Sequence, residues 1–215
     1  ERPNGSWEAL AYVSKKDFME SMDIEAKRLV SALSQAIKNE YSGRMDAAIP
    51  QYMDIYASTF FFPVPFFTDE EEHGSKTDLR TFLAGKISDW VNSTEVKLVQ
   101  VRSLSTTQNV ELYIDLNLEF NGQPVDHLSV RINRPGYAKH AVRNGSVSVF
   151  TDIFPESPTK EYVFELSPII PENIDDDKKE ILAGILPTRE LSQIVDFLPV
   201  IELDIEAELI TGSTY

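Results

Sequence analysis

The chain has 215 residues, of which 42% are hydrophobic, and its 35 acidic against 20 basic residues give a formal net charge of -15. This length suits one large domain, or one domain with a small appended unit, and the apolar fraction is enough to bury a full core. Nucleic-acid binding needs clustered lysines and arginines to neutralise phosphates, so no nucleic-acid partner is expected. The absence of cysteine excludes disulfides, thiolate zinc sites and cysteine nucleophiles.

Helices are expected first along the chain. Residues 1–13 are predicted to be a flexible tail, and 14–215 a single domain with a helical part at 14–93 and a mainly β part at 95–215. Ser14 is a suitable N-cap and Gly43 a suitable C-cap for a first helix. Its apolar residues repeat at helical spacing and form one stripe, made of Phe18, Met22, Ala26, Leu29, Leu33 and Ile37. A second helix is predicted over 45–57, and a third from Thr77 or Asp78 onward.

Five phenylalanines and two prolines fall within 60–67, a composition that fits neither a helix interior nor a central strand. The segment is therefore expected to be an extended aromatic connector. Two interpretations stay open: the rings plug the end of the core, or they form an exposed contact for a partner, a membrane surface or an apolar ligand. The candidate contact residues are Phe60, Phe61, Phe62, Phe66 and Phe67. A charged loop is expected to follow at 68–78.

The clearest strand pattern lies at 110–120, where the even-numbered residues are apolar and the odd-numbered ones are polar. Because successive side chains of a strand point to opposite faces, this pattern predicts one buried and one solvated face. Asn121 and Gly122 tolerate the positive φ of a tight turn, and the alternation resumes at 128–132. The two segments are therefore expected to pair as a hairpin.

Further strands are expected at 97–102, 146–153 and 160–166. Asn173 should cap a helix, and Thr188 a last helical segment before a final strand at 201–209. This order predicts an α+β fold, with N-terminal helices packed on one face of a twisted antiparallel sheet of about five or six strands and short helices before the final strand.

The final strand would carry a row of carboxylates on one face, at Glu202, Asp204, Glu206 and Glu208. Like charges directly opposite each other destabilise strand pairing. We therefore expect bases of other strands to separate this row from the acids of 110–120, or one of the two strands to lie at a sheet edge. The row is interpreted either as solubility and edge protection or as a docking surface for a basic partner.

One basic island interrupts the acidic sequence, at Arg131, Arg134, Lys139 and Arg143. It is interpreted either as a solvated loop that balances nearby acids or as a contact for an anion or carboxylate. The excess of acids over the whole chain favours the first interpretation.

Familiar catalytic and metal-binding motifs do not occur in the sequence, which lacks a nucleophile elbow, a P-loop, a dinucleotide-binding glycine motif and H-E-x-x-H. The three histidines, His73, His127 and His140, lie far apart in sequence, and His127 beside Asp126 is the best candidate among them. The acidic run at 175–177 fits the first turn of a helix better than a calcium loop, which needs alternating acids and a glycine. No catalytic residue, metal ligand or cofactor is therefore assigned.

Two functions are compatible with these patterns. The first is a non-enzymatic binding or assembly module with a protein partner or a second copy, in the extracytoplasmic part of a membrane-associated or surface complex. The alternative is a small-molecule or lipid-binding pocket of cone-like α+β architecture between the first helices and the sheet, with hydrolase activity as an option; this is a fold-level analogy. Membrane proximity suits either function, although no run reaches the ~20 apolar residues of a membrane-spanning helix.

Overall fold

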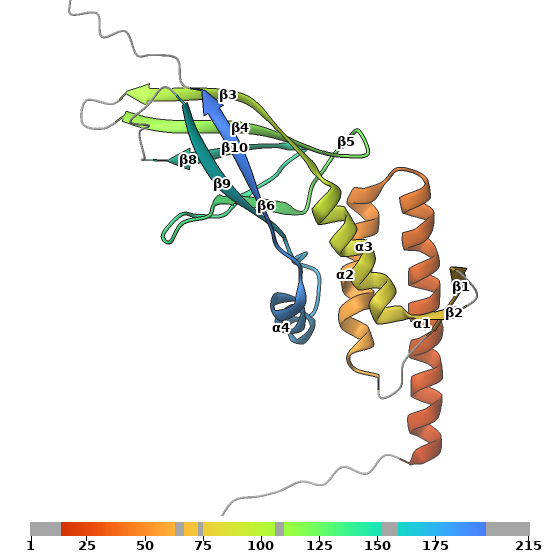
Figure 1. Cartoon of the computed structure of the whole chain (residues 1–215). Coiled ribbons are helices and arrows are strands. Elements are labelled where there is room, and N and C mark those ends of the chain that lie inside the picture. The colour runs from red at the N-terminus through yellow and green to blue at the C-terminus, as the bar shows by residue number, and fades with distance from the viewer. Residues whose placement is uncertain (1–13, 63–66, 73–74, 106–109, 152–158, 197–215) are drawn as a thin grey trace, which may run out of the picture.

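The computed structural model describes residues 14–62, 67–72, 75–105, 110–151 and 159–196. Three helices come first and two antiparallel sheets follow, so the α+β class is confirmed (Figure 1). The strands do not form a single sheet of five or six. They divide into two four-stranded sheets that share one core, and a separate two-stranded hairpin lies beside the helices.

The helical part begins with α1 (Lys15–Tyr41), α2 (Met45–Thr59) and α3 (Leu79–Ser93). Ser14 caps α1 as predicted, because its hydroxyl accepts a hydrogen bond of 3.1 Å from the backbone N–H of Asp17. Gly43, with φ +73°, turns the chain between α1 and α2. Asp78 caps α3 by accepting from the N–H of Thr81 at 3.2 Å. None of the described helices has the length and apolarity needed to cross a membrane.

The prediction of a charged loop at 68–78 is wrong. The chain forms the antiparallel pair β1 (Phe67–Glu72) and β2 (Ser75–Asp78), which leads directly into α3. The register places Glu71 opposite Lys76.

The two larger sheets take their strands from different parts of the chain. One sheet contains β3 (Glu95–Ser105), β4 (Val110–Phe120), β5 (Gln123–Pro124) and β8 (Ser146–Thr151). The other has the order β10-β9-β6-β7, with β6 (Leu128–Ile132), β7 (His140–Ala141), β9 (Thr159–Pro168) and β10 (Arg189–Asp196). In the first sheet, β4 is central, with β3 on one side and β5 and β8 on the other.

The predicted alternation in β4 is confirmed, because Leu112, Ile114, Leu116 and Leu118 are buried. The predicted hairpin with 128–132 is wrong. The Asn121-Gly122 turn leads only into the two-residue β5, and β6 pairs with β9 and β7 in the other sheet. His127, at φ +59°, lies at the change of direction between the two sheets. The local turn signal at Asn121-Gly122 is satisfied by the short strand β5, whereas the partner of β6 is decided by its pairing with the distant strand β9.

Bases of β3 neutralise the acidic face of β4. Lys97 Nζ lies 2.7 Å from a carboxylate oxygen of Glu119, and Arg102 Nε lies 2.6 Å from Asp115. Bases of a neighbouring strand therefore adjoin the acid row of β4, and the expected separation of the two acid rows stays a prediction. The second row, at 201–209, lies outside the described residues.

Near the C-terminal side, α4 (Asp176–Ile185) begins two residues later than predicted, with Asp175 rather than Asn173 at its N-cap. The helical segment predicted after Thr188 is wrong, because Arg189–Asp196 forms β10 and pairs with β9 along its whole length. Its inward residues Leu191, Gln193 and Val195 follow a two-residue period, whereas Leu191, Ile194 and Val195 have the spacing of a short helical stripe. Tertiary pairing decided between the two.

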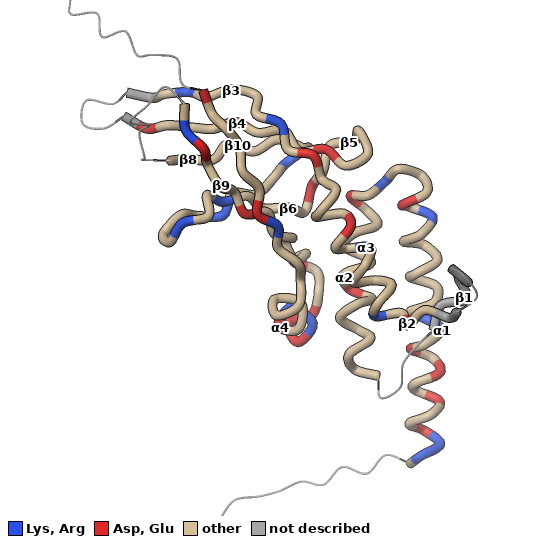
Figure 2. Tube along the Cα trace, in the orientation of Figure 1, with Lys and Arg blue, Asp and Glu red and all other residues tan. Residues whose placement is uncertain are grey.

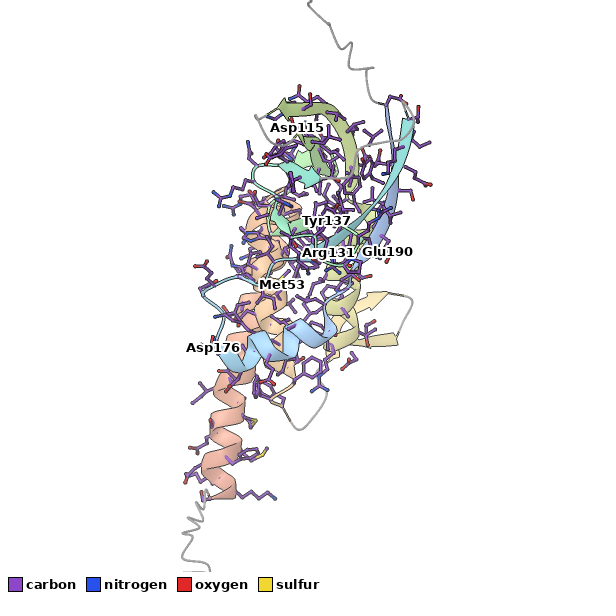
Figure 3. The ribbon with its side chains drawn as sticks, turned by 90° about the vertical axis from the view of Figure 1, so that its left-hand side faces the viewer. Met53, Asp115, Arg131, Tyr137, Asp176 and Glu190 are labelled. Atoms are coloured by element: carbon purple, nitrogen blue, oxygen red, sulfur yellow. The ribbon has the colours of Figure 1, made fainter. Side chains whose placement is uncertain are left out.

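One continuous core joins the helices to both sheets. Its largest fully buried side chains come from α2, α3, β4, β6 and β9, among them Trp90, Tyr52, Met53 and Phe164. Met53 lies in the middle of the molecule in the side-chain view (Figure 3). Described side chains therefore fill the space between the helices and the sheets.

Candidate functional site

The three phenylalanines at the end of α2 have different environments. Phe62 is only 6% exposed and belongs to the core. The ring of Phe60 makes an edge contact with Tyr56, with centroids 5.4 Å apart, and the guanidinium of Arg80 lies 4.8 Å from its centroid. Phe61 is 53% exposed. Each of the two interpretations of the aromatic segment thus fits a different residue: Phe62 is in the core and Phe61 faces solvent.

The first part of this segment is not extended as predicted. The backbone N–H groups of residues 60, 61 and 62 donate to the carbonyls three residues earlier, at 3.1, 3.1 and 3.3 Å. Arg80 of α3 also donates to the carbonyl oxygens of Thr59 and Phe62. These bonds satisfy carbonyls that the end of a helix leaves free, so α2 ends in a tight helical turn.

Several predicted contact residues cannot be placed. Phe66 and the acid row at Glu202, Asp204, Glu206 and Glu208 lie outside the described residues. Phe67 is the first residue of β1, but the structure does not describe its side chain. The aromatic contact surface that the structure does describe therefore centres on Phe61.

Phe61 lines a groove between α1, the end of α2 and the start of α4. The groove has a volume of about 360 Å³ and is lined by Met22, Glu25, Arg28, Ser58, Phe61, Phe62, Asp175, Asp177 and Lys178. A second hollow of about 320 Å³ shares Arg28, Asp175 and Lys178 with it and extends along α2 to Pro50. In Figure 3, α4 crosses the helices with Asp176 at the end beside α1. We call these two neighbouring hollows the α1–α4 groove.

Internal acids already pair with both bases of this groove. Lys178, whose side chain is 12% exposed, lies 2.6 Å from Asp54 and 3.7 Å from Asp175. Arg28 donates through Nε to both carboxylate oxygens of Glu25 at 2.9 Å, and these hydrogen bonds raise the pKa of its guanidinium. The carboxylate of Asp177 makes no hydrogen bond or ion pair with any described residue. The unpaired charge of the groove is therefore negative.

The N-terminal half of α1 extends beyond α2 and α3 (Figure 1). Phe18 and Met19 there are 43% and 57% exposed, and Met22 is half-buried at the groove. Farther along the same stripe, Leu29 is buried. The apolar stripe predicted for α1 is thus covered only over its C-terminal half.

The basic island contains two bases that contact a carboxylate of the protein itself. Arg131 Nη2 lies 2.6 Å from Glu165 of β9, and Lys139 Nζ lies 3.9 Å from the same carboxylate. Lys139 also donates to the hydroxyl of Ser167 at 2.9 Å. Arg134 and Arg143 are exposed. The carboxylate contact proposed for this island therefore has an internal partner at two of its four positions.

A cluster on the outer face of the first sheet surrounds Asp115. Its carboxylate accepts hydrogen bonds from Arg102, Gln100 and Ser148, and these partners, Arg102 foremost, hold its pKa well below the ordinary range. All three donors come from the neighbouring strands β3 and β8. The cluster therefore joins three strands.

No group of acids and histidines in the described part of the chain is arranged to hold a metal ion. Asp126, the neighbour of His127, accepts a hydrogen bond of 2.6 Å from the backbone N–H of Asn144. The carbonyl of His127 accepts from the N–H of Ile169 at 2.7 Å. Both residues thus take part in the turns between strands. His73 lies outside the described residues.

The sequence patterns did not indicate the α4 side of the groove, and they placed Met22 in a stripe that another element should cover. One signal was available in the helix lengths. At 1.5 Å per residue, the 27 residues of α1 span about 40 Å and the 15 of α2 about 22 Å. A partner helix of that length leaves nearly half of the stripe on α1 uncovered.

Comparisons with protein-family models, with curated protein sequences and with solved structures found no match.

Proposed function

We propose that this protein is a non-enzymatic binding or assembly module that docks a protein partner in the α1–α4 groove. The observation that carries the proposal is the exposure of Phe61 inside a hollow between three helices. Large exposed aromatic side chains next to a concave surface are typical of contact sites, where they serve as anchors.

The rigidity of the surroundings supports this role. Arg80 contacts the end of α2 through two backbone carbonyls and the ring of Phe60. Phe62, the residue after Phe61, is buried in the core. Phe61 therefore extends from a fixed backbone, and ordering it on binding costs little conformational entropy.

The alternative, a small-molecule or lipid pocket between the first helices and the sheet, needs an enclosed cavity at that interface. Residues of α2, α3 and β4 there, such as Tyr52, Trp90 and Ile114, are buried within one cluster. The observations on the described residues therefore favour the surface groove.

The proposal can be tested with two matched variants of the tagged full chain. Phe61→Asp places a charge in the groove, whereas Ile194→Asp does so at a comparably exposed apolar residue on β10, far from it in sequence. Both should keep a melting temperature close to that of the wild type. A protein recovered with the wild type and with Ile194→Asp, but not with Phe61→Asp, is the expected result. Equal recovery with both variants would overturn the proposal.

A further inference from the structure

We infer that the occupant of the α1–α4 groove is an amphipathic helix with an apolar face and flanking lysine or arginine side chains. This inference rests on the proposed function and specifies the chemistry of the partner. It follows from the geometry of α1, from the position of Phe61 and from the charge around the groove.

The apolar stripe of α1 has the spacing that accepts a second helix. Phe18, Met22 and Leu29 are four and seven residues apart, so they lie on one face of the helix. Leu29 is buried, whereas Phe18 is 43% exposed. The same face is thus covered at one end of α1 and open at the other.

The open length matches a short helix. α1 is 12 residues longer than α2, 27 against 15, which corresponds to about 18 Å or three turns. A helix lying beside the N-terminal half of α1 would occupy the position that α2 does not reach. Phe61 and Met22, which line the same hollow, would both contact one end of this added helix, and Phe18, one turn farther along α1, would contact its middle.

The charge around the groove selects a cationic partner. The acids that line it are Glu25, Asp54, Asp175 and Asp177, and the bases are Arg28 and Lys178. Each of these two bases is already paired with one of these acids, Arg28 with Glu25 and Lys178 with Asp54. Figure 2 shows this mixture of red and blue on α4 and on the open end of α1. The surplus is acidic, so basic flanks on the partner would be complementary.

The same charge argues against a second copy of this chain as the occupant. The helix that a second copy would offer is the open end of α1, on which Lys15, Lys16, Lys27 and Arg28 balance Asp17, Glu20, Asp23 and Glu25, so it would bring no net positive charge to the groove. With a net charge of -15 on each copy, association would also work against long-range repulsion.

Two labelled peptides of about 18 residues, five helical turns, test the inference by fluorescence anisotropy with the full chain. Both carry leucines on one helical face, and the polar positions are lysine in one and glutamate in the other. We expect the lysine peptide to bind more tightly and to weaken as salt is added, because salt screens exposed charges. Tighter binding of the glutamate peptide, or no difference between the two, would overturn the assigned charge.

Matched charge variants separate the groove from general attraction to an acidic protein. Asp175→Asn with Asp177→Asn removes two charges at the groove, and Glu190→Gln with Asp196→Asn removes two from β10. The groove pair should weaken binding of the lysine peptide about 2–30-fold, because two exposed charge contacts are lost. The β10 pair should leave the affinity for this peptide nearly unchanged. Equal weakening by both pairs would show that the attraction is nonspecific and would overturn the inference.

A local readout distinguishes failure of this inference from failure of the proposed function. The methyl resonance of Met22, identified with Met22→Leu, should shift when the lysine peptide binds. One outcome is an unmoved resonance together with a protein that is still recovered with the wild type and not with Phe61→Asp. That combination would overturn the cationic helix and retain groove docking. Loss of both effects would overturn both proposals.

Discussion

Gly145→Ala should destabilise the protein strongly, although it adds only one methyl group. Gly145 has φ +72° and is buried in the turn before β8. A Cβ there would lie 2.7 Å from Cβ of Pro124 and 2.9 Å from the carbonyl oxygen of Leu118. That oxygen belongs to central β4, and the N–H of Leu118 donates to the Gly145 carbonyl at 2.6 Å. The backbone therefore cannot move aside without disturbing the sheet.

The magnitude follows from three effects on the free energy of unfolding. The left-handed conformation costs an alanine about 1–2 kcal/mol, and overpacking costs about 1–3 kcal/mol. The smaller entropy of the unfolded chain returns about 0.4–1 kcal/mol. We expect a net loss of about 3 kcal/mol, or a fall in melting temperature of about 6–12 °C for a chain of this size.

Gly122→Ala is the matched control, because Gly122 has φ +74° and open space within 4 Å of the point where a Cβ would be added. It should cost about 1 kcal/mol, since only the conformational effects remain. Thermal and urea unfolding followed by circular dichroism measure both variants. Similar losses for the two glycines would refute the claim that contact with Pro124 and Leu118 makes Gly145 necessary.

Three further predictions address the groove and the sheet. Phe62→Ala should lower the free energy of unfolding by about 3–5 kcal/mol, whereas Phe61→Ala should cost about 1 kcal/mol; equal losses in urea unfolding would contradict their assigned burial. Asp115→Asn should cost about 1–2 kcal/mol at neutral pH. Because the folded-state pKa of Asp115 is lowered, its contribution is present above the ordinary carboxyl pKa of about 4 and is lost as the pH falls below it, so the deficit of Asp115→Asn should shrink toward pH ~2. Arg80→Lys keeps the charge but loses the forked hydrogen bonds to the end of α2, so it should cost about 1 kcal/mol and weaken peptide binding in the same anisotropy assay; unchanged binding would show that Arg80 does not position Phe61.

Local patterns determined the elements whose signals lie within a few residues. The cap at Ser14, the buried even positions of β4 and the turn at Asn121 and Gly122 could all be predicted, because capping, alternation and positive φ are properties of neighbouring residues. The sequence also indicated a core-or-contact ambiguity at 60–67, and the structure places Phe62 in the core and Phe61 in solvent.

The tertiary structure alone decided which strands pair and which side chains meet. Segment 128–132 joined β9 rather than β4, and 189–196 became a strand because eight residues of β9 lie opposite it. The groove likewise brings Met22, Phe61 and Asp177 together from three helices, and no local pattern carries that information. The physical reason is that pairing and burial depend on contacts between distant segments, whereas propensity and periodicity act only along the chain.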